Sequence, residues 1–257
     1  MSLTDTTIII PTFHRRGYLR ACLDGIQKNL PECKVIVVSD DDIVPENQWY
    51  NWVTWYSLPY DSGLTAKRNQ AVSAVCTKYT LIGCDDFDFS TLEVRKGIIE
   101  FAAVLKSNEN VDVVAGRVNQ RPYEASRLEY VPGEHIREHA LDLRTELPFI
   151  LKPYTLWKID LAANFFLART QVLREVPWDE TIRPIGGEHA DWFLDLKAAD
   201  KVVAFLPVAN INTQPYDPNK QHPLYSKFRQ RAFETGHALM KMKRNIKSYI
   251  SFDGGIS

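Results

Sequence analysis

Apolar residues recur at two different spacings along the first 115 positions of the chain. Short β-branched runs at 8–10 and 35–38 are typical of buried strands. Residues 17–29 and 65–76 instead carry apolar or small side chains every three or four positions, which is the spacing of one helix face. Because strands and helices alternate, the pattern predicts an α/β fold with a mixed, mostly parallel sheet covered by helices.

The alternation continues beyond these elements, except in one long segment. We expect further strands at 53–58, 79–84, 111–115 and 202–206, and further helices at 92–105 and 188–199. Residues 117–160 mix charges, prolines and scattered aromatics, so we interpret them as an irregular insertion. A proline-containing loop at 210–223 precedes a basic helix. The sequence therefore predicts a main domain over 1–215 and a helical C-terminal extension over 216–257.

The composition is that of a globular protein in a reducing compartment. Of 257 residues, 45% are hydrophobic and 25% are charged, an ordinary balance for a folded domain. No apolar run approaches the roughly 18 residues of a spanning helix, and the opening MSLTDTT lacks the basic region of a signal peptide. The four cysteines show no CxxC spacing. We therefore expect a cytoplasmic protein without a transmembrane segment.

The net charge of −1 conceals a strongly polarised chain. Residues 220–247 hold eight basic residues and one acid, a net of +7, which leaves −8 for the remainder. A uniformly basic nucleic-acid-binding surface is excluded by this balance, but a local one is not. Three interpretations of the tail stay open: binding to DNA, docking on an anionic membrane, and an amphipathic helix that packs on its own domain.

Two acidic clusters follow predicted strands. Asp40, Asp41 and Asp42 come after the strand at 35–38, and the run Cys84-Asp85-Asp86-Phe87-Asp88 follows the strand at 79–84. Ligands of such sheets bind beyond the carboxyl ends of the strands, where both clusters fall. Carboxylates together with substrate phosphates suit Mg²⁺ or Mn²⁺. The alternative for each cluster is a solvated turn.

Two predicted helices begin with residues that could carry chemistry. Gly63 precedes a helix with Lys67 and Arg68 in its first turns, which suits a diphosphate, although a solvated basic pair at an ordinary helix start is the alternative. Gly186 and Gly187 precede Glu188 and Asp191, which lie three residues apart. A carboxylate placed there could accept a proton from a hydroxyl, although acids at a helix start also act simply as caps. A lone histidine, here at position 189, is usually a surface or core residue.

Several of these motifs, in order, resemble one known family. The opening TIIIPTFHR resembles the first strand of family-2-type GT-A glycosyltransferases. The stretches at 63–89 and 164–180, together with GGEHADWFLDL, resemble the β-1,4-N-acetylgalactosaminyltransferase branch of that superfamily. The resemblance runs over about residues 6–208. It implies a GT-A (Rossmann-like) fold, an insertion at 117–160 on the acceptor side, and a nucleotide-sugar donor.

The resemblance also assigns roles to matching positions. Residues implied to bind the nucleotide-sugar are Pro11, Thr12, Arg15, Asp40, Lys67, Arg68, Asp85 and Asn164. Mn²⁺ or Mg²⁺ would be held by Asp86, Asp88 and His222, and the catalytic residues would be Asp191 and Glu188. Two positions depart from the family pattern: Cys84 replaces the first acid of the DxD motif, and Asn212 stands where relatives carry a metal-binding histidine.

The implied reaction is an inverting glycosyl transfer from a UDP-sugar to an acceptor hydroxyl. Asp191 would act as general base, and a divalent ion at Asp86 would stabilise the leaving diphosphate. The acceptor would be a glycan or, given the basic tail, hydroxylated bases in DNA, as with virus-type DNA glycosyltransferases. A non-catalytic nucleotide-sugar-binding module and a nucleotidyltransferase remain as alternatives, and release of UDP from a donor separates an enzyme from a binder.

Overall fold

One large mixed sheet organises the molecule in a computed structural model that describes residues 2–41, 50–119, 125–223 and 225–256. The order of its main path is β3-β2-β1-β4-β12-β6-β13-β10-β9, with β5 paired to β13. The bounds are β1 Thr6–Thr12, β2 Lys34–Ser39, β3 Val53–Ser57, β4 Tyr79–Ile82, β5 Phe87–Asp88, β6 Val113–Val118, β9 Phe149–Leu151, β10 Tyr154–Ile159, β12 Phe166–Arg169 and β13 Val203–Thr213.

Four neighbouring parallel strands form one end of this sheet, and β6 and β13 form a further parallel pair. β3, β2, β1 and β4 run parallel, whereas β12 is antiparallel to both β4 and β6. The run Ile8-Ile9-Ile10 is fully buried at the centre of β1 because both faces of a sheet covered by helices are shielded from water. Because β1, β2 and β4 run in the same direction, their carboxyl ends lie at the same edge of the sheet.

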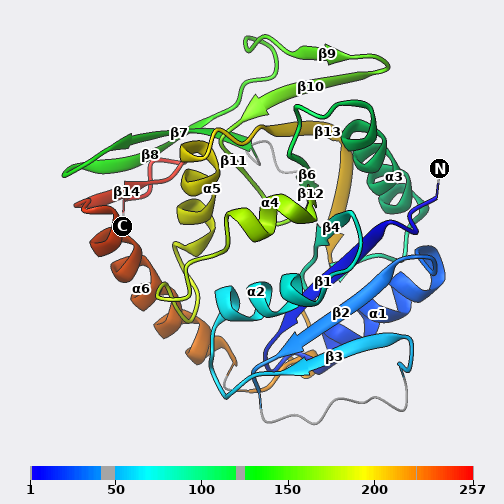
Figure 1. The fold of residues 1–257 in the computed structure, drawn as a ribbon. Coiled ribbons are helices and arrows are strands. Elements are labelled where there is room, and N and C mark those ends of the chain that lie inside the picture. Colours follow the sequence, from blue (N-terminus) through cyan, green and yellow to red (C-terminus); the bar gives the residue numbers. More distant parts are fainter. Residues whose placement is uncertain (1, 42–49, 120–124, 224, 257) are drawn as a thin grey trace.

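Helices cover both faces of the sheet, as Figure 1 shows. α1 (Arg16–Asn29) and α3 (Leu92–Ser107) pack on one face, where Leu23 and Phe101 join a single apolar cluster. α2 (Leu64–Ala74), α4 (Thr170–Glu175) and α5 (Glu188–Ala198) pack on the other face. The predicted elements are confirmed with shifts at their ends, and the largest is that of β13, which runs on to Thr213 and into the predicted loop.

The described part of residues 117–160, a segment expected to be irregular, is largely strands, so that prediction is wrong. β7 (Ala125–Val131) and β8 (His135–Ala140) form a hairpin in a second sheet of order β11-β7-β8-β14, where β11 is Leu161–Ala162 and β14 is Ser248–Ile250. Leu128 and Ile136 are buried on one face of the hairpin, while charged residues alternate with them on the other. Those exposed charges masked the strand pattern in the sequence.

The C-terminal segment belongs to this architecture. After a short 3₁₀ turn (Pro218–Lys220), α6 (Tyr225–Arg244) packs against α5, and β14 adds a parallel strand to β8. In Figure 1 the chain ends beside β14, next to α6. Met240 of α6 is fully buried in the cluster that also contains residues of α5. Among the described residues, no helix combines the length and apolarity needed to cross a bilayer.

Glycines allow α6 to approach the loop before α5. A Cβ added at Gly236 of α6 would lie 2.3 Å from the carbonyl oxygens of both Ile185 and Gly186. Gly186 and Gly187 adopt φ values of +108° and +79°, a region that favours glycine. The two glycines before α5 therefore allow both the turn itself and the close packing of α6 against it.

Replacing Gly236 with alanine should lower stability even though alanine favours helices. Helix propensity alone would stabilise the variant by about 1 kcal/mol, whereas the clash with two carbonyl oxygens should cost about 1–3 kcal/mol. Ala238→Gly, at an exposed position of the same helix, measures the propensity effect without the clash. Urea unfolding should show both variants destabilised, and a Gly236→Ala protein more stable than wild type would contradict this packing.

Candidate active site

A cavity of about 760 Å³ opens at the carboxyl ends of β1, β2 and β4. Its walls come from the strand ends, from the beginnings of α2 and α5, from α6 and from the second sheet. The volume is in the range of small-molecule sites. The structure brings together at this cavity all eight residues implied to bind the nucleotide-sugar, namely Pro11, Thr12, Arg15, Asp40, Lys67, Arg68, Asp85 and Asn164.

Lys67 and Asp40 form a buried ion pair at one end of the cavity. The Lys67 Nζ donates to Asp40 Oδ1 and also to the carbonyl oxygen of Thr12, at 3.2 Å. Asp40 Oδ2 accepts from the backbone N–H of Gly63 at 2.9 Å. The pair ties the ends of β1 and β2 to the start of α2, so it fixes the cavity wall and leaves Lys67 already engaged. Asp42 of the same acidic run lies outside the described residues.

Arg15 holds the acidic residues that follow β4. Its two terminal nitrogens donate to Asp85 Oδ1 and Asp86 Oδ2, each at 2.8 Å. Asp85 Oδ2 also accepts from the Thr12 hydroxyl at 2.8 Å. Burial raises the pKa of Asp85, although the charge of Arg15 acts in the opposite direction. These contacts orient the Asp86 carboxylate toward the cavity, where it is partly exposed.

Arg68 is a buried cation with unused hydrogen-bond donors. Its residue is only 1% exposed, and within the described part of the chain no carboxylate forms an ion pair with it. Nη2 donates to Asn164 Oδ1 at 2.8 Å, and the guanidinium lies 5.2 Å from the ring centroid of Trp178. Nε and Nη1 have no partner among the described residues. Burial lowers the pKa of Arg68, although the charge of Glu188 acts in the opposite direction.

Of the three predicted metal ligands, only Asp86 lines the cavity. Asp88 pairs with Asn212 across β5 and β13, and its Oδ1 accepts from the N–H of Ser90 at 2.9 Å. The ring of His222 lies 4.8 Å from that of His14, between centroids. Across the described ranges, no three histidine, cysteine or acidic side chains are grouped as a metal site. One carboxylate plus substrate phosphates is nevertheless a coordination that Mg²⁺ and Mn²⁺ use, so Asp86 alone fits the ion.

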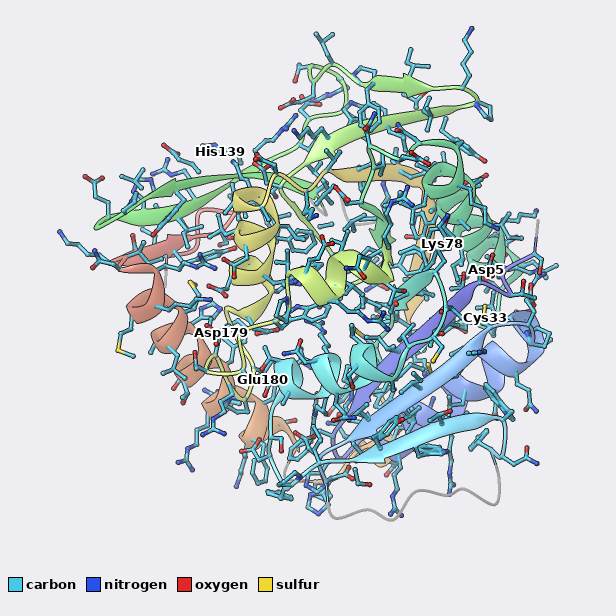
Figure 2. All side chains as sticks on the ribbon, in the orientation of Figure 1. Asp5, Cys33, Lys78, His139, Asp179 and Glu180 are labelled. Atoms are coloured by element: carbon cyan, nitrogen blue, oxygen red, sulfur yellow. The ribbon has the colours of Figure 1, made fainter. Side chains whose placement is uncertain are left out.

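The structure places Asp191 away from the cavity, so the expectation that it faces a pocket is wrong. The residue is 1% exposed, and its carboxylate accepts from Lys243 at 2.8 Å and from Arg244 Nε at 2.5 Å. Asp179, labelled in Figure 2 on the loop before α5, joins the cluster at 2.8 Å from Lys243. Asp191 therefore fastens α6 to α5, an ion-pair role that a motif within one helix could not reveal.

Glu188 is not in the cavity either. It is 6% exposed, and its Oε2 accepts from the backbone N–H of Gly186 at 2.5 Å. The carboxylate thus closes the glycine turn at the start of α5. Glu188 therefore stabilises the turn before α5, and within the described residues it does not cap the helix through a side-chain hydrogen bond.

Sequence reasoning missed the part of the cavity that α6 and the second sheet build. The additional lining residues on these elements include Tyr225, Phe228, Arg229, Arg231, Thr235 and Glu138. The signal was present in the basic and aromatic residues of the tail. Its placement depends on the packing of Gly236 on Gly186, which no local pattern contains. His189, set aside as an ordinary histidine, also lines the cavity.

Comparisons with known proteins place the chain among glycosyltransferases. No protein-family model matches it. It is 32% identical over 234 residues to β-1,4 N-acetylgalactosaminyltransferase 2 of Mus musculus, covering 87% of this chain and 43% of that protein. It is 33% identical over 194 residues to β-1,4 N-acetylgalactosaminyltransferase 1 of Homo sapiens, covering 74% of this chain and 35% of that protein. The chain therefore spans less than half the length of these relatives.

Solved structures share the fold at lower identity. A crystal structure of GalNAc-T7 with UDP, GalNAc and Mn²⁺ superposes with a TM-score of 0.62 at 10% identity, over 81% of this chain and 43% of that chain. S. aureus TarS 1–349 superposes with a TM-score of 0.56 at 17% identity, over 96% of this chain and 67% of that chain. The sequence matches and the shared fold confirm the GT-A resemblance that the motifs predicted.

Asp191→Asn tests the anchoring role through stability. Loss of the charge leaves Lys243 and Arg244 facing a neutral amide, and breaking a fully buried pair costs about 3–5 kcal/mol, less to the extent that the two cations reach solvent. Asp195→Asn, whose side chain is 33% exposed and meets the same cations, should cost about 0–1 kcal/mol. Urea unfolding measures both. Equal stability of the two variants would contradict the anchoring role.

Proposed function

We propose that this chain, a GT-A protein related to the β-1,4-N-acetylgalactosaminyltransferases, transfers an N-acetylhexosamine from a UDP-sugar to an acceptor hydroxyl. One observation carries the proposal: Arg68, which lines a cavity at the carboxyl ends of parallel strands, has two buried N–H groups without a partner among the described residues. A guanidinium of this kind suits the diphosphate of a nucleotide-sugar. The names of the relatives, and the UDP-GlcNAc complex of TarS, favour UDP-GalNAc or UDP-GlcNAc as donor.

In this proposal the UDP-sugar donor binds to the cavity residues that the sequence resemblance implied for it. Its nucleoside would lie by Asp40 and Thr12, and its diphosphate by Arg68. Asn164 holds the Arg68 guanidinium in place through Nη2, so that Nε and Nη1 remain for phosphate oxygens. Because the positive charge is buried and already oriented, it stabilises the charge that develops on the leaving diphosphate at little reorganisation cost.

A divalent ion fits at Asp86. When bound there, Mg²⁺ or Mn²⁺ would neutralise diphosphate charge as the bond to the sugar breaks. Arg15 holds Asp86 through one carboxylate oxygen only, so the other can face the ion. Asp88 and His222 do not belong to this site. The cation and Arg68 are two separate sources of positive charge for one diphosphate.

The acceptor we propose is a glycan hydroxyl. The alternative of hydroxylated bases in DNA depends on the charge of residues 220–247, but Lys243 and Arg244 already bind carboxylates of this chain. Arg229 and Arg231 are exposed, but both also line the cavity. These contacts, and the packing of α6 against α5, favour the interpretation of the tail as an amphipathic helix on its own domain. An inverting outcome and a cytoplasmic location stay predictions from the sequence.

Arg68→Met should weaken UDP binding and slow transfer. A hydrogen-bonded charge contributes about 1.5–3 kcal/mol, so the Kd of UDP should rise about 10- to 100-fold. Calorimetry measures this, and mass spectrometry measures UDP release from UDP-GalNAc and UDP-GlcNAc with a glycan panel. Arg95→Met is the matched control, since Arg95 pairs with Glu32 away from the cavity. If the wild-type chain binds UDP but releases none from any donor, it is a binding module and the transferase proposal fails.

Asp86→Asn should abolish the metal dependence of nucleotide binding. In wild type, adding Mn²⁺ should tighten UDP binding, because Asp86 would hold the ion and its charge would attract the phosphates. Asp88→Asn keeps the same change of charge two residues away, outside the cavity, and should behave as wild type. Calorimetry with Mn²⁺ and with a chelator distinguishes the two. If Mn²⁺ tightened UDP binding to the Asp86→Asn protein as much as to wild type, the ion would have to bind at another site.

A further inference from the structure

His189 reaches the cavity that its acidic neighbours miss. It is the second residue of α5, and successive helical residues point about 100° apart. Glu188 and Asp191 consequently face the glycine turn and α6, whereas His189 lines the cavity. The ring packs edge-on against Phe193, with 5.0 Å between ring centroids. This contact leaves the imidazole with a defined orientation.

One hydrogen bond fixes the tautomer of this imidazole. Nε2 contacts the carbonyl oxygen of Ala162, which can only accept, so Nε2 carries the proton. The neutral ring then has its lone pair on Nδ1. Nδ1 is buried and has no partner among the described residues. A buried proton acceptor without a donor is unfavourable unless a ligand supplies one.

The same short segment positions His189 and Arg68. Ala162 accepts the proton of His189 Nε2, and Asn164, two residues later, accepts from Arg68 Nη2 at 2.8 Å. Ala162, Ala163 and Asn164 all line the cavity between them. One stretch of backbone therefore supports both the imidazole of His189 and the guanidinium of Arg68.

The environment keeps the imidazole neutral before a ligand enters. Burial, and after it the positive charge of Arg68, lower the pKa of His189 to about 4. At neutral pH the ring is thus in the form that can accept a proton. A bound diphosphate would neutralise the charge of Arg68, which is one of the two causes of the lowered pKa of His189. Nδ1 would therefore be more basic when the donor is present.

We propose that Nδ1 of His189 accepts the proton of the acceptor hydroxyl, in place of Asp191. The inference rests on the proposed transferase function. The hydroxyl oxygen forms a bond to the anomeric carbon, the bond from that carbon to the diphosphate oxygen breaks, and its electron pair leaves with UDP. The proton passes to Nδ1, and the resulting imidazolium returns it to solvent after the products leave.

Other carboxylates in the cavity are less suited to this step. Glu138 accepts hydrogen bonds from the Tyr249 hydroxyl and from the N–H of Phe252, at 3.4 Å for the latter. Asp61 is exposed and lies beside Asp40, where the nucleoside would bind, and its N–H donates to the carbonyl of Asp40 at 3.0 Å. Asp85 and Asp86 are held by Arg15. His189 alone among these groups offers a buried acceptor atom without a partner.

His189→Gln is the first test, because the glutamine amide can keep the bond to Ala162 while removing Nδ1. The kcat for transfer from UDP-GalNAc, or for its hydrolysis by water, should fall about 10²- to 10⁴-fold, the usual contribution of a general base. The Kd of UDP should stay near the wild-type value. His139→Gln is the matched control, since His139 lies on β8 and pairs with Glu129 (Figure 2).

His189→Gly with added imidazole separates a chemical role from a structural one. Imidazole should restore turnover in proportion to its neutral form, so the restored rate should follow the pKa of free imidazole. A position that only supports the fold would give no such pH profile. The His189→Gly variant tests the same role by a second substitution, should His189→Gln fold poorly.

The outcomes separate this inference from the proposed function. If wild type is active and His189→Gln turns over as fast, the base is elsewhere and only the inference fails. A loss of turnover in Glu138→Gln as large as expected for His189→Gln, with His189→Gln unaffected, would assign the proton to Glu138. If wild type neither transfers nor hydrolyses any UDP-sugar, the proposed function fails and takes the inference with it.

Discussion

A buried guanidinium without a counter-ion is the constraint on which this site depends. Arg68 lies in α2 with its charge inside the protein, supported by Asn164 and by the face of Trp178. Burying a cation in this way is costly unless an anion or a set of hydrogen bonds compensates. The fold compensates Lys67 with Asp40 and Arg15 with two aspartates, but leaves two donors of Arg68 open. The sheet edge is therefore prepared for an anion that the chain itself does not contain.

The C-terminal helix completes the site and is fastened by the residue first expected to do chemistry. Asp191 binds Lys243 and Arg244, and the glycines at 186, 187 and 236 let the backbones of α6 and the preceding loop come close. This close seating places Tyr225 and Phe228 in the cavity wall. Half of the eight basic residues that suggested a nucleic-acid surface thus lie at the cavity, as Arg229 and Arg231 do, or in ion pairs, as Lys243 and Arg244 do. Asp191, near the start of α5, thus holds two helices together, whereas His189 of the same helix lines the cavity.

The sequence predicted the parts whose information is local. Ile8-Ile9-Ile10 becomes a buried strand because every position is apolar, and Lys67 and Arg68 reach the strand ends because their helix starts at Gly63. The hairpin of β7 and β8 escaped prediction because charged residues alternate with Leu128 and Ile136. The roles of Asp191 and His189 escaped it for another reason. Which side of α5 faces the cavity is decided by α6, some 50 residues further along the chain, and not by spacing within the motif.

A structure of this chain bound to UDP in the presence of Mn²⁺ tests the central claim most directly. The account predicts phosphate oxygens within about 3 Å of Arg68 Nε and Nη1, at ordinary hydrogen-bond distance. It also predicts the ion between Asp86 and the diphosphate. A diphosphate bound elsewhere, with both nitrogens of Arg68 still unpartnered, would contradict it.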